Sequence, residues 1–254
     1  MSDDIGRVLG AWDYEPGELR VRTIDGEKGD GQKGERKIQI RIDLGIMQLT
    51  WSGRPDGTRP HDRASLLDHY ESARAQWEGA ENEEAFTLSH QDCWALGQEA
   101  MQYYWRRISF FELKEYERAE EDAVHNLGIL DLCESYAEHD EDRSISDQYR
   151  VFVTAHRIQA RALRLLEQED HNEALSVIRD GIAEVEQIIE GQGELEYMEE
   201  SPELKFLNQW EKEVEESRPL SPREKLNVDL RTAVEQEKFE LAASLRDKIR
   251  KMEE

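Results

Sequence analysis

The sequence predicts an α+β fold that is mostly α, with a small N-terminal antiparallel β meander, central helical hairpins and a C-terminal two-helix hairpin. Apolar residues alternate with polar ones early in the chain, then recur at helical spacing, and turns containing glycine or proline separate the segments. We expect an antiparallel β region over 1–62, a helix and acidic linker over 63–87, a helical domain over 88–191, a short helix and Pro-containing linker over 192–222, and the hairpin over 223–254.

Three short runs predict the β meander. Residues 18–25 and 36–43 alternate in the manner of half-buried strands, and residues 46–51 form a third run after a Leu44-Gly45 turn. The inward positions are Leu19, Val21 and Thr23 in the first run and Ile38, Ile40 and Ile42 in the second. Gly53-Arg-Pro-Asp-Gly57 ends the third run, because proline presets one turn dihedral and glycine accepts a positive one.

A glycine-rich stretch, residues 26–34, connects the first two runs and suits a long hairpin loop. Within it, residues 29–34 match the letters GxGxxG of a dinucleotide-binding loop. That loop must open a helix, whereas a strand follows here, and Asp30 would face the pyrophosphate. The pattern therefore predicts a hairpin connection.

From Asp62 onward the apolar spacing becomes helical. A first helix carries Leu67 and Trp77, with Ser65 or Asp62 as its cap, and an acidic linker covers 78–86. We expect four longer helices over 89–111, 116–136, 146–166 and 172–189, an acidic solvated loop over 138–143, and a shorter helix opening at Ser201-Pro202.

Two of these helices begin alike. A polar turn precedes Ala119 in one and Ala174 in the other, which resembles the tetratricopeptide (TPR) pattern, where a small alanine lets the second helix of a hairpin pack closely on the first. The two alanines are 55 positions apart, and the repeat period of that family is about 34 residues. Both TPR-like hairpins and an ordinary up-down four-helix bundle remain open at this point.

The tail holds the most specific pattern. After Leu226, Leu230 and Ala233 on one helical face, residues 237–238 form a turn and a second helix begins. That helix contains Phe239-Glu-Leu-Ala-Ala-Ser-Leu-Arg-Asp-Lys-Ile249. The run resembles the UVR motif of the B and C subunits of the bacterial excision nuclease, Phe-Glu-x-Ala-Ala-x-x-Arg-Asp-x-Ile, and the approach from Ala233 to Phe239 is matched as well.

The resemblance implies a docking hairpin, because the motif joins two subunits in the excision nuclease and related hairpins occur in a Clp ATPase and its adaptor. It implies Phe239 as the anchor, with Arg246 and Asp247 making charged contacts. Leu241, Leu245, Ile249 and Met252 form one apolar stripe, and Phe239, Ala242 and Ala243 form a second stripe beside it. A single partner helix cannot cover both stripes. The expected partner-binding residues are Leu226, Leu230, Phe239, Leu241, Ala242, Ala243, Leu245, Arg246, Asp247 and Ile249.

The formal net charge is −25 at pH 7, and it is unevenly distributed. Residues 223–254 contain 8 basic and 8 acidic residues, so residues 1–222 contain the remaining 25 basic and 50 acidic residues. Such a body repels a phosphate backbone, so we expect no direct nucleic-acid binding. Simple solubility, an anionic face for a basic partner and DNA mimicry are the alternative interpretations.

Nothing in the sequence predicts catalysis. Cys93 and Cys133 lack CxxC partners, which favours two buried apolar thiols over a disulfide or a zinc site. The seven histidines include no HExxH pair, and no nucleophile motif is present. The helicase motifs, nuclease carboxylates and CxxC pairs of the resembled proteins are also absent. We expect no enzyme activity, no cofactor and no metal.

We further expect a cytoplasmic protein, since the chain begins without a secretory signal pattern and contains no run of about 20 apolar residues for a membrane. The leading hypothesis is a protein-interaction adaptor linked to nucleotide excision repair, with a UVR-bearing excision-nuclease subunit as partner. The alternatives are an adaptor for Clp-type proteolysis, binding a Clp component, and a regulatory homo-oligomer, such as a homodimer, joined by its own hairpins.

Overall fold

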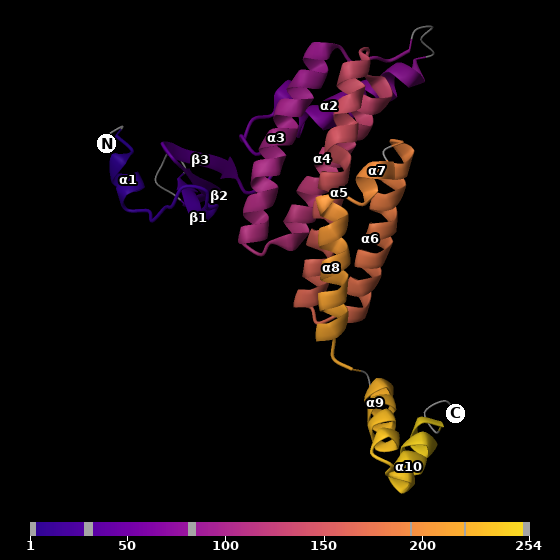
Figure 1. The fold of residues 1–254 in the computed structure, drawn as a ribbon. Helices are drawn as coiled ribbons and strands as arrows, with labels where there is room; N and C mark the ends of the chain where they lie inside the picture. The colour runs from indigo at the N-terminus through magenta and orange to yellow at the C-terminus, as the bar shows by residue number, and fades with distance from the viewer. Residues whose placement is uncertain (1–3, 28–32, 81–84, 194, 221, 251–254) are drawn as a thin grey trace. The chain divides into compact units, whose positions relative to one another are not determined.

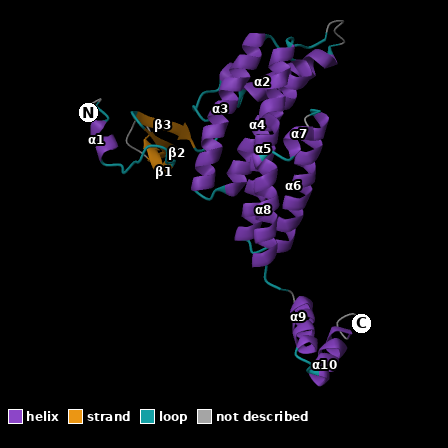
Figure 2. Ribbon diagram, viewed as in Figure 1, coloured by secondary structure: helices purple, strands orange, loops and turns teal. Residues whose placement is uncertain are grey.

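The computed structural model describes residues 4–27, 33–80, 85–193, 195–220 and 222–250. By its internal contacts the chain divides into two compact units, Met1–Gln209 and Trp210–Glu254, and each is considered by itself. The first unit holds a small sheet and a stack of helices, and the second ends in a helical hairpin (Figures 1 and 2). The predicted class, mostly helical with an N-terminal three-stranded antiparallel sheet and C-terminal helices, is confirmed.

The sheet is an antiparallel meander in the order β1-β2-β3. Its strands are β1 (Arg20–Glu27), β2 (Lys33–Ile42) and β3 (Gly45–Thr50). The register places Ile38 opposite Thr23 on one side and Leu49 on the other, so the predicted inward residues share one face.

Strands β1 and β2 extend into the predicted glycine-rich connection, of which residues 28–32 lie outside the described part. Gly26 and Gly34 are strand residues. A side chain at position 26 would lie 2.6 Å from the Glu35 carbonyl oxygen, where the register shifts between Asp25 and Glu27. Glycine is therefore required by the close approach of two backbones.

The expectation that residues 1–62 are extended was wrong at two points. Helix α1 (Gly6–Gly10) precedes the sheet, where the Asp4 carboxylate accepts a hydrogen bond from the Gly6 amide (2.8 Å). A 3-10 turn, η1 (Pro60–Asp62), follows the sheet, and Pro60 suits its first position because proline needs no backbone donor there. Both segments are too short to show a helical period in the sequence.

The remaining elements are helices. They are α2 (Leu66–Gly79), α3 (His90–Glu112), α4 (Tyr116–Tyr136), α5 (Asp140–Glu167), α6 (His171–Gly191), α7 (Leu195–Met198), α8 (Pro202–Ser217), α9 (Pro222–Glu235) and α10 (Phe239–Arg250). Ser65 caps α2 by accepting a hydrogen bond from the Asp68 amide, as predicted, and Ser89 forms a capping box with Asp92 at the start of α3. Residues 81–84 of the predicted acidic linker lie outside the described part, and α7 was not predicted.

The interpretation of residues 138–143 as a solvated loop was wrong, because Asp140, Glu141 and Asp142 form the first turn of α5. Carboxylates stabilise a helix N-terminus through the exposed amides and the helix dipole. Asp142 is buried and accepts a hydrogen bond from His90 Nδ1 (2.9 Å). The turn has few apolar residues, so periodicity alone did not reveal it.

Three helical hairpins have loops of the same length and backbone geometry. Between α3 and α4, α5 and α6, and α9 and α10, three residues connect the helices, and the middle one (Lys114, Glu169 or Glu237) has a positive φ of 56–61°. In each loop the third amide donates to a carbonyl five residues earlier, as from Glu115 to Phe110 (2.9 Å). This is the Schellman motif, normally closed by glycine. The alanine four positions after each loop, Ala119, Ala174 or Ala242, is buried.

Packing in the helical middle runs between successive helices, α3 on α4, α4 on α5 and α5 on α6, while α2 contacts α3 and α4 (Figure 1). A closed up-down bundle also pairs its first helix with its fourth, and α3 with α6 is not a principal contact. The arrangement therefore favours stacked hairpins over a closed bundle.

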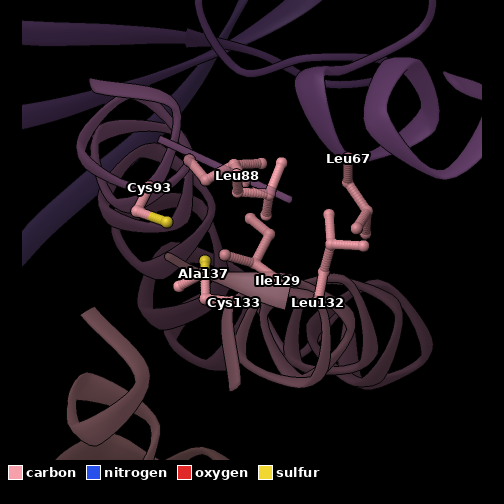
Figure 3. Close-up of a cluster of buried hydrophobic side chains, with 8 residues drawn as sticks. Leu67, Leu88, Cys93, Ile129, Leu132, Cys133 and Ala137 are labelled. Carbon is pink, nitrogen blue, oxygen red and sulfur yellow. The ribbon is translucent and has the colours of Figure 1, made fainter. Parts of the chain in front are cut away.

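The core of the first unit lies in two main clusters. One joins the sheet to the helices, with Ile38 and Ile40 of β2 fully buried against Phe110 of α3 and Ala119 of α4. The other lies around α2, α3 and α4 (Figure 3). Its buried members are Leu67, Leu88, Cys93, Leu96, Ile129, Leu132, Cys133 and Ala137.

The two cysteines meet in this second cluster, with both sulfurs on its α3–α4 side (Figure 3). They are buried and unbridged, as expected for small apolar residues. A hydrogen bond between the thiols lowers the pKa of Cys93 and, together with burial, raises that of Cys133.

Candidate protein-docking surface

The C-terminal hairpin has a small core of its own. Ala233 of α9 and Ala242 and Leu245 of α10 are buried together, with Leu226 and Leu230 packed against them. The small alanines let the two helices approach closely. Four residues of the predicted partner-binding set, Leu226, Leu230, Ala242 and Leu245, thus contribute to holding the hairpin closed.

The other predicted residues lie outside that core. Phe239 is 68% exposed, and Leu241 is 50% exposed. Ala243, Arg246 and Asp247 are exposed as well, and Ile249 is half-buried. Met252 lies outside the described residues. An exposed phenylalanine at the start of a helix is unusual, because fully burying such a ring is worth about 1.5–3 kcal/mol.

Helical spacing separates these exposed residues into two sides of α10. Phe239, Ala243 and Arg246 follow one another at intervals of four and three residues, so they share one side. Leu241 is two positions from Phe239 and lies on the other flank. We call Phe239, Ala243 and Arg246 the Phe239 face. Val234 of α9, 51% exposed, precedes the same loop and was not predicted.

The charges of Arg246, which belongs to the Phe239 face, and of its neighbour Asp247 have no partner within the described part of the chain. Neither Arg246 nor Asp247 makes an ion pair or a side-chain hydrogen bond there. Lys248 and Arg250 add positive charge to the last turn of α10, where cations complement the helix dipole. The surface therefore offers an aromatic ring flanked by charges of both signs.

Comparison with known protein families identifies this hairpin. Residues 223–254 match the UvrB/uvrC motif. The UVR motif occurs in UvrB- and UvrC-type proteins and mediates protein interactions. The match covers the C-terminal hairpin, called the UVR hairpin below, which is a small part of the chain. No curated protein matches the chain, and no solved structure does.

A second cluster that invites a functional interpretation is the buried carboxylate Glu99 of α3. It accepts hydrogen bonds from Arg54 Nε (2.7 Å), His125 Nε2 (3.0 Å) and the first two amides of α2, Leu66 (2.8 Å) and Leu67 (3.2 Å). Burial raises the pKa of Glu99, but these hydrogen bonds outweigh it and the pKa is lowered. With four donors, Glu99 caps α2 and anchors the segment after β3.

Arg106 of α3 works in the same way. It donates two hydrogen bonds to Asp122 of α4 (2.9 and 2.7 Å) and one to the Gly53 carbonyl (2.6 Å), although burial raises the pKa of Asp122. Sequence reasoning missed Glu99, Arg106 and Asp122, since a charged residue within an apolar stripe carries no signal of its partner. These satisfied contacts support a structural role.

Arg107 is the exception among the buried charges. It is fully buried, and its Nε and Nη1 atoms have no hydrogen-bond partner. Its guanidinium lies 5.5 Å from the ring centroid of Tyr104 and 5.9 Å from that of Phe152, and burial lowers its pKa to about 10. Cation–π contacts replace part of the lost hydration.

Metal and membrane sites were also considered. No group of three or more metal-ligating side chains occurs within residues 4–27, 33–80, 85–193, 195–220 and 222–250. In the same ranges, no helix combines the length and the apolar character needed to span a bilayer.

Proposed function

We propose that this protein is a non-enzymatic adaptor that docks on a protein partner through the UVR hairpin. The observation that carries the proposal is Phe239, exposed on a hairpin whose small core is already filled by Leu245 and the alanines of α9 and α10. A two-helix unit of this size gains little stability alone, and covering an exposed aromatic ring on a partner stabilises both.

The finer proposal is a partner that bears its own UVR hairpin, such as a subunit of the excision nuclease, which would link the chain to nucleotide excision repair. The family match supports this choice. A Clp component remains the alternative partner. The tail is electrically neutral, whereas residues 1–222 are strongly acidic, so binding through the tail avoids most charge repulsion. We place the adaptor in the cytoplasm.

Self-association is a second candidate, and adjacent charges favour it. Arg246 and Asp247 are neighbours on α10, so two copies related by a twofold axis can pair the arginine of one with the aspartate of the other. The Phe239 rings would then cover each other, which makes the hairpin a homotypic clasp.

The test is binding of the full chain to a purified UVR-bearing excision-nuclease subunit, compared among three variants. Phe239→Ala removes the exposed ring, and we expect affinity to fall about tenfold or more, as for an interface anchor. Val228→Ala is the matched control, since Val228 of α9 is also exposed, 46%, but outside the Phe239 face. Leu245→Ala should reduce binding by opening the hairpin.

The outcomes separate the candidates. If Phe239→Ala and the parent chain bind the subunit with equal affinity, the proposed docking role of Phe239 is wrong. If the free chain is a dimer by light scattering and Phe239→Ala is a monomer, the homotypic clasp is favoured. Circular dichroism of both exposed-site variants should match the parent, because neither residue belongs to the hairpin core.

A further inference from the structure

The outward face of the sheet is cationic in a chain that is strongly acidic. Because side chains alternate across a strand, the residues opposite in face to Ile38 and Ile40 point away from the helical core. The cross-strand rows on this outward face are Arg20, Arg41 and Ile46, then Arg22, Gln39 and Gln48, then Ile24, Lys37 and Thr50. Four of these nine residues are cations and none is acidic, while the exposed Glu35, two residues before Lys37 on β2, lies next to the last row.

Two guanidinium groups on this face are held in position. Arg22 donates to Gln39 Oε1 from Nε (2.9 Å) and Nη2 (2.7 Å), and Gln39 in turn donates to Gln48 (2.9 Å). The ring of Trp12 lies 4.0 Å from the Arg22 guanidinium carbon. Such stacking and hydrogen bonding fix the fork of an arginine before a ligand arrives, which reduces the entropy lost on binding.

Arg41 is held by the same means. Its Nη1 donates to the carbonyls of Asp43 and Gly45 (both 3.2 Å), and the ring of Tyr14 lies 4.7 Å from its guanidinium carbon. The carboxylate that is nearest in sequence, Asp43, accepts a hydrogen bond from the Tyr14 hydroxyl (2.5 Å). The charge of Arg41 is therefore left without an ion pair in the described part of the chain.

Three cations of the face, Arg22, Lys37 and Arg41, have no carboxylate within ion-pair distance among the residues described. Only Arg20 is paired, with Glu18 (2.6 Å). Acidic residues outnumber basic ones by 25 in this chain, so carboxylates were available to neutralise the face. The positive charge is thus concentrated on one side of a small sheet, on three side chains that are half-buried and that no described carboxylate neutralises.

We propose that the outward face of the sheet binds a short acidic segment of a separate polypeptide, with its carboxylates on Arg22, Arg41 and Lys37. Guanidinium–carboxylate pairs are strong and directional, and two prepositioned arginines suit two carboxylates. The face is three strands wide, about 10 Å between its outer strands, which matches a few residues of extended chain.

The size of the face and the total charge decide among anionic partners. A nucleic-acid strand extends its regular phosphate charge beyond the sheet and over an acidic body, which repels it. A second copy brings another net charge of −25, and two identical cationic faces cannot pair with each other. A short acidic segment brings only the charges that the face can neutralise.

The test uses the full chain and a fluorescent oligoglutamate peptide, with an oligothymidylate of equal charge as comparison. The double variant Arg22→Gln, Arg41→Gln should weaken peptide binding about tenfold or more, and added salt should weaken binding to the parent chain. The matched control is Arg161→Gln, Lys205→Gln, which removes two exposed charges elsewhere in the same unit and should leave affinity unchanged.

Three results would overturn the proposal. These are absence of peptide binding by the parent chain, equal loss in the control variant, and preference for the oligothymidylate over the peptide. Self-association of the free chain that disappears in the double variant would assign the face to a second copy instead. Phe239→Ala should bind the peptide normally, so failure here and failure of the UVR docking role are distinguishable.

Discussion

Gly181 marks the closest approach of α5 and α6. A methyl group at this position would lie 2.6–2.7 Å from three side-chain carbons of Ile158. Gly181→Ala should therefore lower the free energy of unfolding by about 1–3 kcal/mol, measured by urea denaturation. The added methyl group would be too close to three carbons of Ile158 at once, so the helices or the Ile158 side chain must shift.

Gly97→Ala is the control for this prediction. Gly97 also lies inside a helix, α3, but nothing lies within 4 Å of the added methyl group. Alanine is the better helix former by about 1 kcal/mol, so this variant should be slightly more stable than the parent. A loss of stability in both variants would contradict the steric argument.

His156 of α5 should make stability depend on pH. It packs against Phe152 (ring centroids 4.3 Å apart) and Phe111 (5.5 Å), and burial, assisted by Arg107, lowers its pKa to about 4. In the unfolded chain a histidine has a pKa of about 6.5. The unfolded state therefore binds the proton at a higher pH than the folded state does. The stability contributed by neutral His156 is fully present above about pH 6.5 and is lost as the pH falls toward 4.

The effect of His156 is isolated by comparing the parent chain with His156→Phe. Urea denaturation at pH 7 and pH 5 should show a smaller loss of stability in the variant, by on the order of 1–2 kcal/mol. Carboxylates such as Glu99 also respond to acid, and they respond equally in both proteins. The same pH dependence in both would exclude His156 as its source.

At the scale of elements, the same Schellman loop recurs between α3 and α4, between α5 and α6, and between α9 and α10. Glu169 between α5 and α6 has a φ of 61°, which costs a residue with a side chain about 1 kcal/mol relative to glycine. We expect Glu169→Gly to raise the free energy of unfolding by about 0.5–1 kcal/mol, since glycine relieves the strain but adds freedom to the unfolded chain.

Its neighbour Gln168 supplies the control. Gln168 has a φ of −85°, so Gln168→Gly relieves nothing and should cost about 0.5–1 kcal/mol. Both side chains are exposed, which removes packing from the comparison. Opposite signs for the two variants would show that the left-handed conformation is responsible, and equal signs would refute it.

At the scale of the whole molecule, the net charge of −25 should oppose folding by self-repulsion. Screening shortens its range from about 30 Å at 0.01 M salt to about 8 Å at 0.15 M. The melting temperature should therefore rise by several degrees over that range at pH 7. A fall would mean that surface ion pairs, such as those of Arg150 with Asp131 and Glu134, outweigh the repulsion.

Much of the fold followed from the sequence because its signals are local. Alternation at Ile38 and Ile40 predicted a strand, helical spacing predicted α3 to α6, and the run from Phe239 to Ile249 predicted the UVR hairpin. Periods of two and 3.6 residues depend only on which residues must face the core. Sequence alone therefore determined the strands and the longer helices, their order and the identity of the tail, while the short elements α1, η1 and α7 were not predicted.

Tertiary structure decided which side chains meet. Ala242 and Phe239 both belong to the motif, yet packing buries the first and exposes the second. Glu99 reaches the first amides of α2 across more than thirty positions in the chain, and the cations Arg22 and Arg41 share a face only because β1 pairs with β2 in one register. These contacts depend on distances between elements, which periodicity within an element does not contain.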